Sequence, residues 1–277
     1  MNIFLTGATG FIGKNFLSLA LKKKHFIYAV ARKKQILQHK NLKWLIGSLD
    51  KNWSNELKES NVLVHLASDG VVNKKISYHK AKEFNVTKSI SLFKNAVKNN
   101  CKNWIVAGSM SEYGANCRKI KKLSIRTNPK PETNYEKTKY IFSKKIILLS
   151  KKTQSKCRIM RIFHVFGDGE YKKRLYPSLI NAAKKNKDFV IKNGNEVRDF
   201  VDVKFVSKVL LDSCNFKKRK FNSYQIWHIA SGKAMNIKTF AKKVWKKYKS
   251  KARLKFNKQN IKTINNFVSD KKSIWRV

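Results

Sequence analysis

The chain begins with Met1-Asn-Ile-Phe-Leu-Thr-Gly-Ala-Thr-Gly-Phe-Ile-Gly13, an apolar stretch that runs directly into three glycines spaced three residues apart. The apolar stretch predicts a short buried strand over residues 2–6. Apolar residues recur at helical spacing after the glycines, which predicts a helix over 11–23. A strand, a glycine turn and a helix in this order form the context in which a dinucleotide binds.

Each glycine of this turn has a different expected role. Gly7 lets the chain turn tightly, Gly10 leaves room for a pyrophosphate, and Gly13 lets the helix pack close to the strand. The free N–H groups and the dipole at the helix N-terminus favour the bound anion. The spacing is G-x-x-G-x-x-G and not the common G-x-G-x-x-G, so a chance glycine turn is the alternative interpretation.

The end of the second predicted strand, 26–31, bears on the choice of dinucleotide. Arg32-Lys-Lys34 follows this strand directly. An acidic residue here would bind the ribose 2′-hydroxyl of NAD, whereas an arginine can bind the 2′-phosphate of NADP. We therefore expect NADP or NAD as the cofactor, with Arg32 favouring NADP. The alternative is that Arg32 only reflects the basic composition of the chain.

The composition is that of a folded but very basic protein. The chain has 277 residues, 42% of them hydrophobic, and its 63 Lys and Arg against 16 Asp and Glu give a formal charge of +47. Such a charge attracts nucleic acids, anionic membranes and phosphorylated substrates alike. Because lysines are spread over the whole sequence, we expect solvated surfaces and no specific nucleic-acid site. A cofactor-binding protein that binds nucleic acid is the alternative from another class.

Cysteine and histidine spacing gives no sign of a metal or redox centre. The four cysteines are not paired in sequence and the six histidines are scattered, so we expect no metal site. Unpaired cysteines favour reduced thiols and a cytoplasmic location. No apolar run approaches membrane-spanning length, and we expect no signal peptide, because the sequence opens directly on a predicted strand.

Alternating strands and helices predict an α/β protein with a Rossmann-type, doubly wound parallel sheet. Candidate strands are 2–6, 26–31, 43–46, 62–66, 103–107 and 157–163, and candidate helices are 11–23, 77–99 and 134–151, with another near 51–58. We expect a dinucleotide-binding domain over 1–166 and a smaller C-terminal substrate-binding lobe over 167–277. The boundary is soft, because the later elements interleave with the sheet: helix 175–186, strands 189–192 and 197–202, helix 203–213, strand 224–230 and helix 236–248.

Tyr135 and Lys139 lie four residues apart on one predicted helix, so their side chains share a face. A nearby ammonium and a nicotinamide cation would lower the pKa of the phenol from its usual value near 10. Such a phenol can exchange a proton with a sugar or alcohol oxygen while hydride moves to or from nicotinamide. Ser109, at the end of a predicted strand, can hydrogen-bond the same oxygen. Alone, a tyrosine and a lysine at this spacing are a common accident in a lysine-rich helix.

Taken together, these stretches resemble the NAD-dependent epimerase/dehydratase family of extended short-chain dehydrogenases, which act on nucleotide sugars. The glycine turn resembles the family's T-G-x-x-G-F-I-G, and Val64-His-Leu-Ala67 resembles its H-L-A strand end. Two later stretches resemble R-x-x-N-V-Y-G and R-D-F-x-H-V; they are Arg161-Ile-Phe-His-Val-Phe-Gly167 and Arg198-Asp-Phe-Val-Asp-Val203. The resemblance covers nearly the whole chain.

The resemblance implies roles for particular residues. The implied catalytic residues are Ser109, Tyr135 and Lys139. The implied cofactor-binding residues are Gly7, Gly10, Phe11, Ile12, Gly13, Arg32, Leu49, Leu66, Ala67, Asn85, Tyr135 and Lys139. The implied substrate-binding residues are Ser68, Ser109, Met110, Ser111, His164 and Arg198, where Arg198 would contact the nucleotide diphosphate. We also expect a homodimer.

Three reactions share this machinery, and the sequence separates them only in part. The family's 4,6-dehydratases place Asp-Glu directly after the catalytic serine or threonine, where this chain has Met110 and Ser111. Glu112 is one position later, so dehydration is disfavoured. Gly108-Ser-Met-Ser-Glu-Tyr-Gly114 resembles the G-[ST]-x-x-E-Y-G of sugar-nucleotide 4-reductases. We therefore expect a 4-ketoreductase that transfers hydride at sugar C4, with an NAD-dependent C4 epimerase as the alternative.

Overall fold

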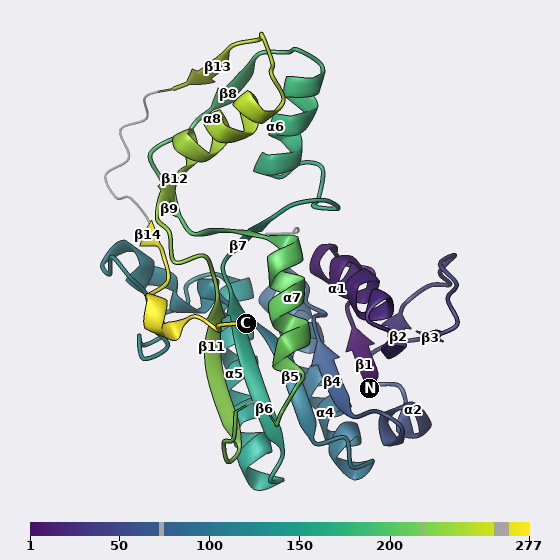
Figure 1. Ribbon diagram of the computed structural model, residues 1–277. Coiled ribbons are helices and arrows are strands. Elements are labelled where there is room, and N and C mark those ends of the chain that lie inside the picture. The colour runs from purple at the N-terminus through teal and green to yellow at the C-terminus, as the bar shows by residue number, and fades with distance from the viewer. Residues whose placement is uncertain (72–74, 218, 258–265) are drawn as a thin grey trace.

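A seven-stranded sheet forms the centre of the protein (Figure 1). The computed structural model describes residues 1–71, 75–217, 219–257 and 266–277. The strands stand in the order β11-β6-β5-β4-β1-β2-β3 and every neighbouring pair is parallel. Their bounds are β1 Asn2–Thr6, β2 Phe26–Ala31, β3 Leu42–Ile46, β4 Val62–His65, β5 Asn103–Ser109, β6 Lys156–Ile162 and β11 Tyr224–Ile229.

The strand order confirms the predicted doubly wound sheet. The chain runs outward from β1 to β3 and then returns to β4 on the other side of β1. Ligands of such sheets bind beyond the carboxyl ends of the strands at this reversal. The glycine turn, which follows β1, therefore lies at the switch point.

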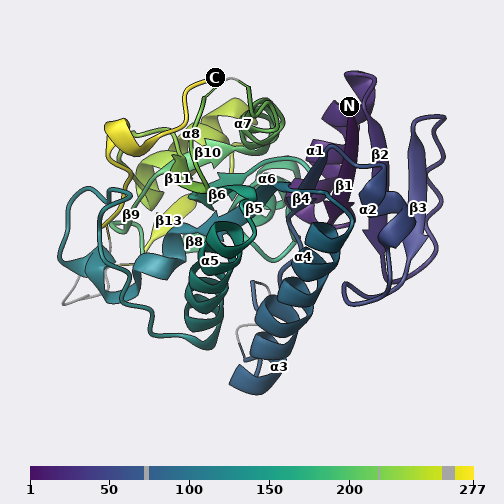
Figure 2. The same cartoon turned by 90° about the horizontal axis from the view of Figure 1, so that it is seen from below.

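Helices cover both faces of the sheet (Figure 2). Helix α1 (Phe11–Lys22) packs beside α7 (Val203–Ser213) on one face. Helices α2 (Ser54–Lys58), α4 (Ser89–Lys98) and α5 (Asn134–Lys152) cover the other. Each face has its own apolar core, and β1 contributes to both because its side chains alternate between Ile3 and Leu5 on one side and Phe4 on the other.

The helix predicted over 77–99 is continuous but not uniform. It begins as α3 (Tyr78–Lys82), passes through a π-helical turn, η1 (Glu83–Lys88), and continues as α4. The hydroxyl of Ser89 donates to the carbonyl of Phe84, which lies five residues earlier. Such turns are rare and occur often at functional sites, and this one contains Asn85.

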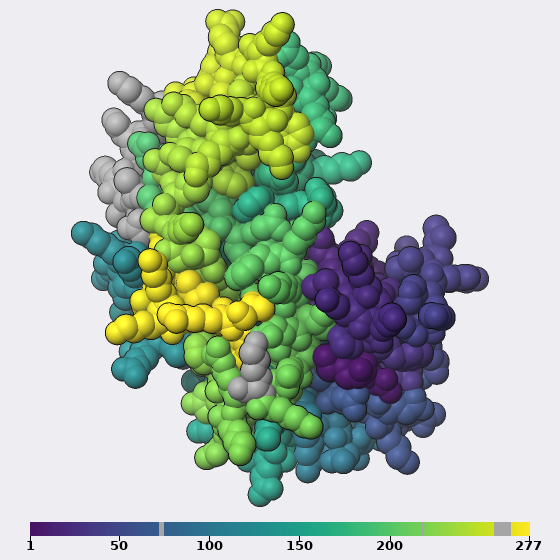
Figure 3. Space-filling model, viewed as in Figure 1, coloured from purple at the N-terminus to yellow at the C-terminus, as the bar shows by residue number. Residues whose placement is uncertain are grey.

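A smaller lobe stands over the carboxyl end of the sheet, at the top of Figure 1. It packs α6 (Leu175–Lys184) and α8 (Ile237–Lys247) against the strands β8 (Phe189–Ile191) and β13 (Leu254–Phe256) around a third apolar core. Short strands join it to the sheet: β7 (His164–Phe166) pairs with β10 (Phe200–Asp202), and β9 (Val197–Arg198) lies between β12 (Met235–Asn236) and β14 (Asn266–Phe267). The outline of the molecule is indented between this lobe and the block around α1 (Figure 3).

The chain after residue 167 does not stay in the lobe. It leaves the lobe to form α7, which packs on one face of the large sheet, and β11, which is the edge strand of that sheet, and then returns to the lobe through β12 and α8. The four cysteines are buried and unpaired. Among the described residues, no helix is both long and apolar enough to span a membrane.

Candidate active site

The glycine turn is closed too tightly for side chains. Gly7 has a φ of +74°, and a Cβ there would lie 2.6 Å from the backbone nitrogen of Ala67. A Cβ at Gly13 would lie 1.9 Å from the carbonyl oxygen of Gly7. The missing side chains therefore let α1 pack closely against β1 and let the end of β4 lie beside the turn.

Helix α1 begins without a side-chain cap. Gly10 is its N-cap residue, and the first turn carries no acidic side chain. Phe11 and Ile12 open the helix and are partly exposed. The first N–H groups of the helix therefore lack a capping partner, which suits a bound anion such as a pyrophosphate.

The other expected cofactor residues follow the neighbouring strands. Leu66 and Ala67 come directly after β4, and the N–H of Leu66 donates to the carbonyl of Thr6 at 3.2 Å. Leu49 is buried behind the end of β3, whereas Arg32 follows β2 and is exposed. These residues share the carboxyl edge of the sheet with the glycine turn.

Asn85 lies at this edge, but its amide is engaged within the protein. Its Nδ2 donates to the carbonyl of Asp69 at 3.0 Å and to Oγ1 of Thr138 at 3.1 Å. Its Oδ1 accepts from the N–H of Asp69 at 2.7 Å and from the hydroxyl of Ser68 at 3.2 Å. Asn85 therefore ties the loop after β4 to helix α5, and it places Ser68 relative to that helix.

Helix α5 presents Tyr135 and Lys139 to the same region. A capping box fixes its first turn, because Thr133 accepts from the N–H of Glu136 and the carboxylate of Glu136 accepts from the N–H of Thr133. Tyr135 lies in this turn, and its phenol interacts with the side chains of Ser109 and Ser68. Serines from the ends of two strands thus meet the tyrosine of the helix; the expected hydrogen bond from Ser109 to the reacting oxygen stays a prediction.

Burial shifts the pKa values of both Tyr135 and Lys139. Burial raises the pKa of Tyr135 to about 12, and hydrogen bonding to Ser109 and Ser68 only partly opposes this. Burial also lowers the pKa of Lys139 to about 8, and its Nζ donates to the carbonyl of Ala107 at 2.7 Å. Desolvation thus dominates at Tyr135 in the protein without cofactor, and the expected lowering of its pKa by the ammonium and a nicotinamide cation together stays a prediction. The phenol is held protonated at neutral pH.

Ser109 is positioned by the buried carboxylate of Glu112, a role that differs from the acid of a dehydratase considered above. Ser109 caps the 3₁₀ helix η2 (Met110–Arg118) by accepting from the N–H of Ser111 at 3.1 Å. The Oε1 of Glu112 accepts from the N–H of Ser109 at 2.9 Å, which completes a capping box. The spacing Ser-x-x-Glu was a readable signal for this role.

The same carboxylate belongs to a buried polar network. Its Oε2 accepts from Nε of Arg161 at 3.2 Å, and neither side chain is more than 4% exposed. Arg161 in turn donates to the hydroxyl of Tyr113 at 2.8 Å, and that hydroxyl lies 2.6 Å from Nε2 of His228. The Nδ1 of His228 lies 2.7 Å from the hydroxyl of Ser269. The network therefore joins the Ser109 loop to the C-terminal segment.

The expected substrate residues His164 and Arg198 lie beneath the lobe. His164 belongs to β7, and burial together with the charges of Arg198 and Arg174 lowers its pKa well below the usual value. Arg198 belongs to β9, and Glu196 accepts from its guanidinium at 3.0 Å. Met110 and Ser111 open η2 beside Ser109 and are partly exposed.

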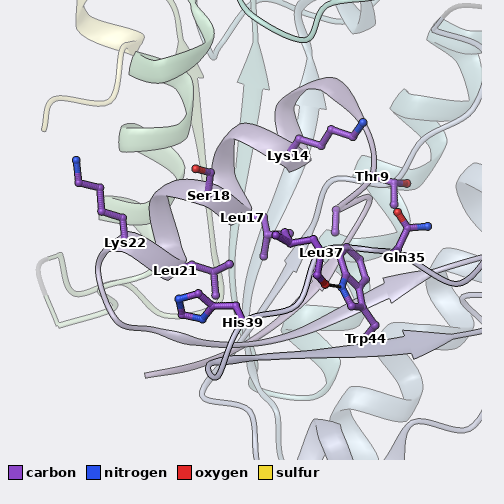
Figure 4. A pocket seen from close by; sticks show the side chains of 11 residues that line it. Thr9, Lys14, Leu17, Ser18, Leu21, Lys22, Gln35, Leu37, His39 and Trp44 are labelled. Carbon is purple, nitrogen blue, oxygen red and sulfur yellow. Dashed lines mark hydrogen bonds between the residues drawn. The ribbon is translucent and has the colours of Figure 1, made fainter.

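A pocket of about 470 Å³ lies between α1 and residues 35–44 (Figure 4). Apolar side chains of α1 and the stretch before β3 form its floor, and Nε1 of Trp44 donates to the carbonyl of Leu37 at 2.7 Å. Ala8 and Thr9 of the glycine turn contribute to its wall. Neither Tyr135 nor Ser109 lines it, so it lies apart from the expected catalytic side chains.

The chain matches proteins of known activity. The model of the "NAD dependent epimerase/dehydratase family" matches residues 3–226. A UDP-glucose 4-epimerase of Vibrio cholerae is 26% identical over 175 residues, which are 61% of this chain and 53% of that protein. A dTDP-6-deoxy-L-talose 4-dehydrogenase (NAD(+)) of Aggregatibacter actinomycetemcomitans is 22% identical over 265 residues, 93% of this chain and 94% of that protein.

Solved structures match the fold over almost the whole chain. The UDP-glucose 4-epimerase of Thermotoga maritima, solved with UDP-glucose, superposes with a TM-score of 0.83 and 18% identity. The superposition covers 98% of this chain and 90% of the other. The chain therefore belongs to the NAD dependent epimerase/dehydratase family of enzymes.

Proposed function

We propose that the protein transfers hydride between NAD(H) and C4 of a nucleoside-diphosphate sugar, and that it acts as a 4-ketoreductase. The observation that carries this proposal is the meeting of Tyr135, from the first turn of α5, with Ser109 and Ser68 at the carboxyl edge of the sheet. A phenol beside two serine hydroxyls can give its proton to a ketone oxygen that these hydroxyls orient. The 4-dehydrogenase relative, which aligns over 93% of the chain, supports the same reaction class.

The residues present fit a nicotinamide dinucleotide. The uncapped N-terminus of α1 and the glycine turn would hold its pyrophosphate, and Leu66 and Ala67 would lie beside it. The bound cofactor supplies the hydride. Tyr135 would donate its proton to the sugar C4 oxygen, while the hydroxyl of Ser109 would orient that oxygen. Lys139, held by the carbonyl of Ala107, would favour the phenolate that forms.

The burial and the hydrogen bonds of the Glu112 carboxylate argue against a 4,6-dehydratase. Dehydration needs an acid and a base that reach the sugar beside the catalytic serine. Both oxygens of Glu112 are engaged, one by the N–H of Ser109 and the other by Arg161, and the side chain is fully buried. Met110 and Ser111 occupy the positions next to Ser109 and carry no carboxyl group.

A C4 epimerase is the second candidate, and the 26% identity with the Vibrio cholerae UDP-glucose 4-epimerase favours it. An epimerase returns its hydride to the sugar and so consumes no net NADH, whereas a ketoreductase oxidises one NADH for each sugar reduced. The two are separated by incubating the protein with NADH and a nucleoside-diphosphate 4-keto-6-deoxyhexose. We expect NADH oxidation in proportion to sugar reduction.

The surface charge calls for a test of nucleic-acid binding, the alternative from another class. We expect binding to random DNA that fades by physiological salt, the generic response of a protein with a formal charge of +47. Tight binding with a sequence preference would favour the alternative. The homodimer and the cytoplasmic location remain predictions.

Changing Arg32 to aspartate should shift the binding preference from NADPH toward NADH. Arg32 follows β2, where its guanidinium would reach a 2′-phosphate. We expect Arg32→Asp to weaken NADPH binding and to leave NADH binding equal or tighter, because a carboxylate repels the phosphate and accepts from a free 2′-hydroxyl. Fluorescence titrations of both cofactors on parent and variant measure this. Equal changes for NADH and NADPH would remove Arg32 from the 2′-site.

Removing the guanidinium of Arg198 should weaken binding of the substrate and leave binding of the cofactor unchanged. The side chain is 25% exposed and is held by Glu196, so it is oriented before a ligand arrives. A guanidinium can bind a diphosphate through two parallel charged hydrogen bonds, which lysine cannot copy. We expect Arg198→Ala to raise the KM of the nucleotide sugar by about ten- to a hundred-fold, and Arg198→Lys to recover only part of this. A change confined to the KM of NADH would contradict the assignment.

A further inference from the structure

The pocket between α1 and residues 35–44 has the size and the lining of a ligand site, and the proposed reaction does not use it. Its volume of about 470 Å³ lies within the usual range for small-molecule sites, roughly 300–1,000 Å³. Its floor is apolar, because Leu17 and Leu21 of α1 face Leu37 and Trp44 across the pocket (Figure 4). Ligand sites combine such a lining with a few polar groups that orient the ligand.

A hydrogen bond holds the wall of the pocket opposite α1. Nε1 of Trp44, in β3, donates to the carbonyl of Leu37 at 2.7 Å. This bond uses the single donor of the indole and ties the stretch before β3 to the sheet. Leu37 is nevertheless 51% exposed. The apolar wall is therefore formed already and stays in contact with water unless an occupant covers it.

The charge of the lining has one sign. Apart from His39, its ionisable side chains are Lys14 and Lys22, and no aspartate or glutamate belongs to the described part of the lining. Neither ammonium makes a hydrogen bond or an ion pair with a described residue. Because lysines are spread over the whole chain, the apolar slot and not its charge distinguishes the site. The charge decides that the occupant is an anion and not a cation.

The lining also sets the shape and the direction of the occupant. It follows α1 from Lys14 to Lys22, eight residues or about 12 Å of helix, so the occupant is long and narrow. The first turn of α1 carries the positive end of the helix dipole and its last turn the negative end. Figure 4 shows Thr9 and Gln35 at the Lys14 end. An anionic group is therefore stabilised at that end.

We propose that this pocket binds an acyl carboxylate, with its chain over the leucines of the floor and its carboxylate at Lys14. A saturated chain matches an elongated lining in which leucines predominate. A partner protein fits less well, because a stable protein interface buries about 800 Å² on each side and this floor is only a few side chains wide. The inference is independent of the proposed function, since it needs neither a dinucleotide nor a nucleotide sugar.

Calorimetric titrations with octanoate, decanoate and decylammonium test the ligand class. They are made at physiological salt and below the micellar concentrations. Each methylene buried in the slot strengthens binding about four-fold, so we expect decanoate to bind at one site and about fifteen-fold more tightly than octanoate. Decylammonium, with the same chain and the opposite charge, should not bind. Many weak sites for decanoate, or equal affinities for octanoate and decanoate, would show adsorption to the basic surface and overturn the proposal.

Leu37→Glu tests where the chain lies. The carbonyl of Leu37 and not its side chain bonds Trp44, so the variant should fold like the parent, which thermal unfolding checks. We expect it to bind decanoate at least about ten-fold more weakly, because it replaces apolar wall by a like charge. Leu148→Glu is the control, on a leucine of α5 that is 63% exposed and outside the pocket. Equal affinities of the two variants for decanoate would overturn the placement.

Lys14→Gln tests where the carboxylate lies. We expect it to weaken decanoate by up to about five-fold, the contribution of an exposed ion pair. Lys23→Gln, on a lysine outside the lining, should bind decanoate like the parent. Equal affinities of these two variants would contradict the orientation of the ligand.

The cofactor is the competing occupant, because Ala8 and Thr9 of the glycine turn contribute to the wall. NADH and NADPH are therefore titrated with and without saturating decanoate. We expect both dinucleotides to bind while decanoate stays in place. If neither dinucleotide binds the parent, the proposed function fails and the decanoate result stands. If a dinucleotide displaces decanoate and Leu37→Glu loses that dinucleotide as well, the pocket is part of the cofactor site and the inference fails.

Discussion

Changing Tyr135 to phenylalanine should lower turnover by on the order of 10² to 10⁴, which is the usual contribution of general acid–base catalysis. The substitution keeps the ring that packs at the start of α5 and removes only the hydroxyl in contact with Ser109 and Ser68. The fold and NADH binding should therefore stay nearly intact. Steady-state NADH oxidation with a nucleoside-diphosphate 4-keto-6-deoxyhexose measures the loss, and a fluorescence titration checks the cofactor.

Tyr140→Phe is the matched control, since Tyr140 lies on the same helix. Its ring contacts the ammonium of Lys144 and no expected catalytic residue. The control variant should turn over at the rate of the parent. If Tyr135→Phe also stayed within a few-fold of the parent, Tyr135 would not be the proton donor.

Changing Glu112 to alanine should destabilise the protein by about 3–5 kcal/mol, because it leaves the buried guanidinium of Arg161 without its carboxylate. Glu112 is fully buried and Arg161 is 4% exposed, so water cannot replace the missing partner. The change also removes the acceptor for the N–H of Ser109. Urea unfolding of parent and variant measures the effect.

An exposed ion pair provides the control for this measurement. Nη2 of Arg118 lies 2.6 Å from Oε1 of Glu132, but the two side chains are 37% and 50% exposed. We expect Glu132→Ala to change the free energy of unfolding by less than about 1 kcal/mol, as exposed pairs do. Equal losses for the two variants would show that the network around Glu112 does not hold the Ser109 loop.

Much of the fold could be predicted from the sequence because its sheet is buried on both faces. Strands such as 26–31 are continuous apolar runs, and helix 203–213 shows a clear helical period, so both were predicted with the bounds that the structure shows. The glycine turn showed where the first strand ends and the first helix begins. The polar and short strands of the lobe were less well bounded: the strand predicted over 197–202 is two strands, β9 and β10.

The site was harder to predict, because burial and tertiary partners decide its chemistry. The sequence placed Ser109, Tyr135 and Lys139 together by their positions at strand ends and on a helix. It could not show that burial would raise the pKa of Tyr135 despite its interactions with Ser109 and Ser68. Nor could it show that Arg161, from β6, would take up the second oxygen of Glu112.

The central claim is direct hydride transfer to sugar C4, and deuterium tests it most directly. NADH carrying deuterium at the transferred position of nicotinamide C4 is incubated with the protein and a nucleoside-diphosphate 4-keto-6-deoxyhexose, and the product sugar is examined by NMR. We predict one deuterium at sugar C4 for each NADH oxidised. Epimerised sugar without net NADH oxidation, or a reduced sugar without deuterium at C4, would contradict the account.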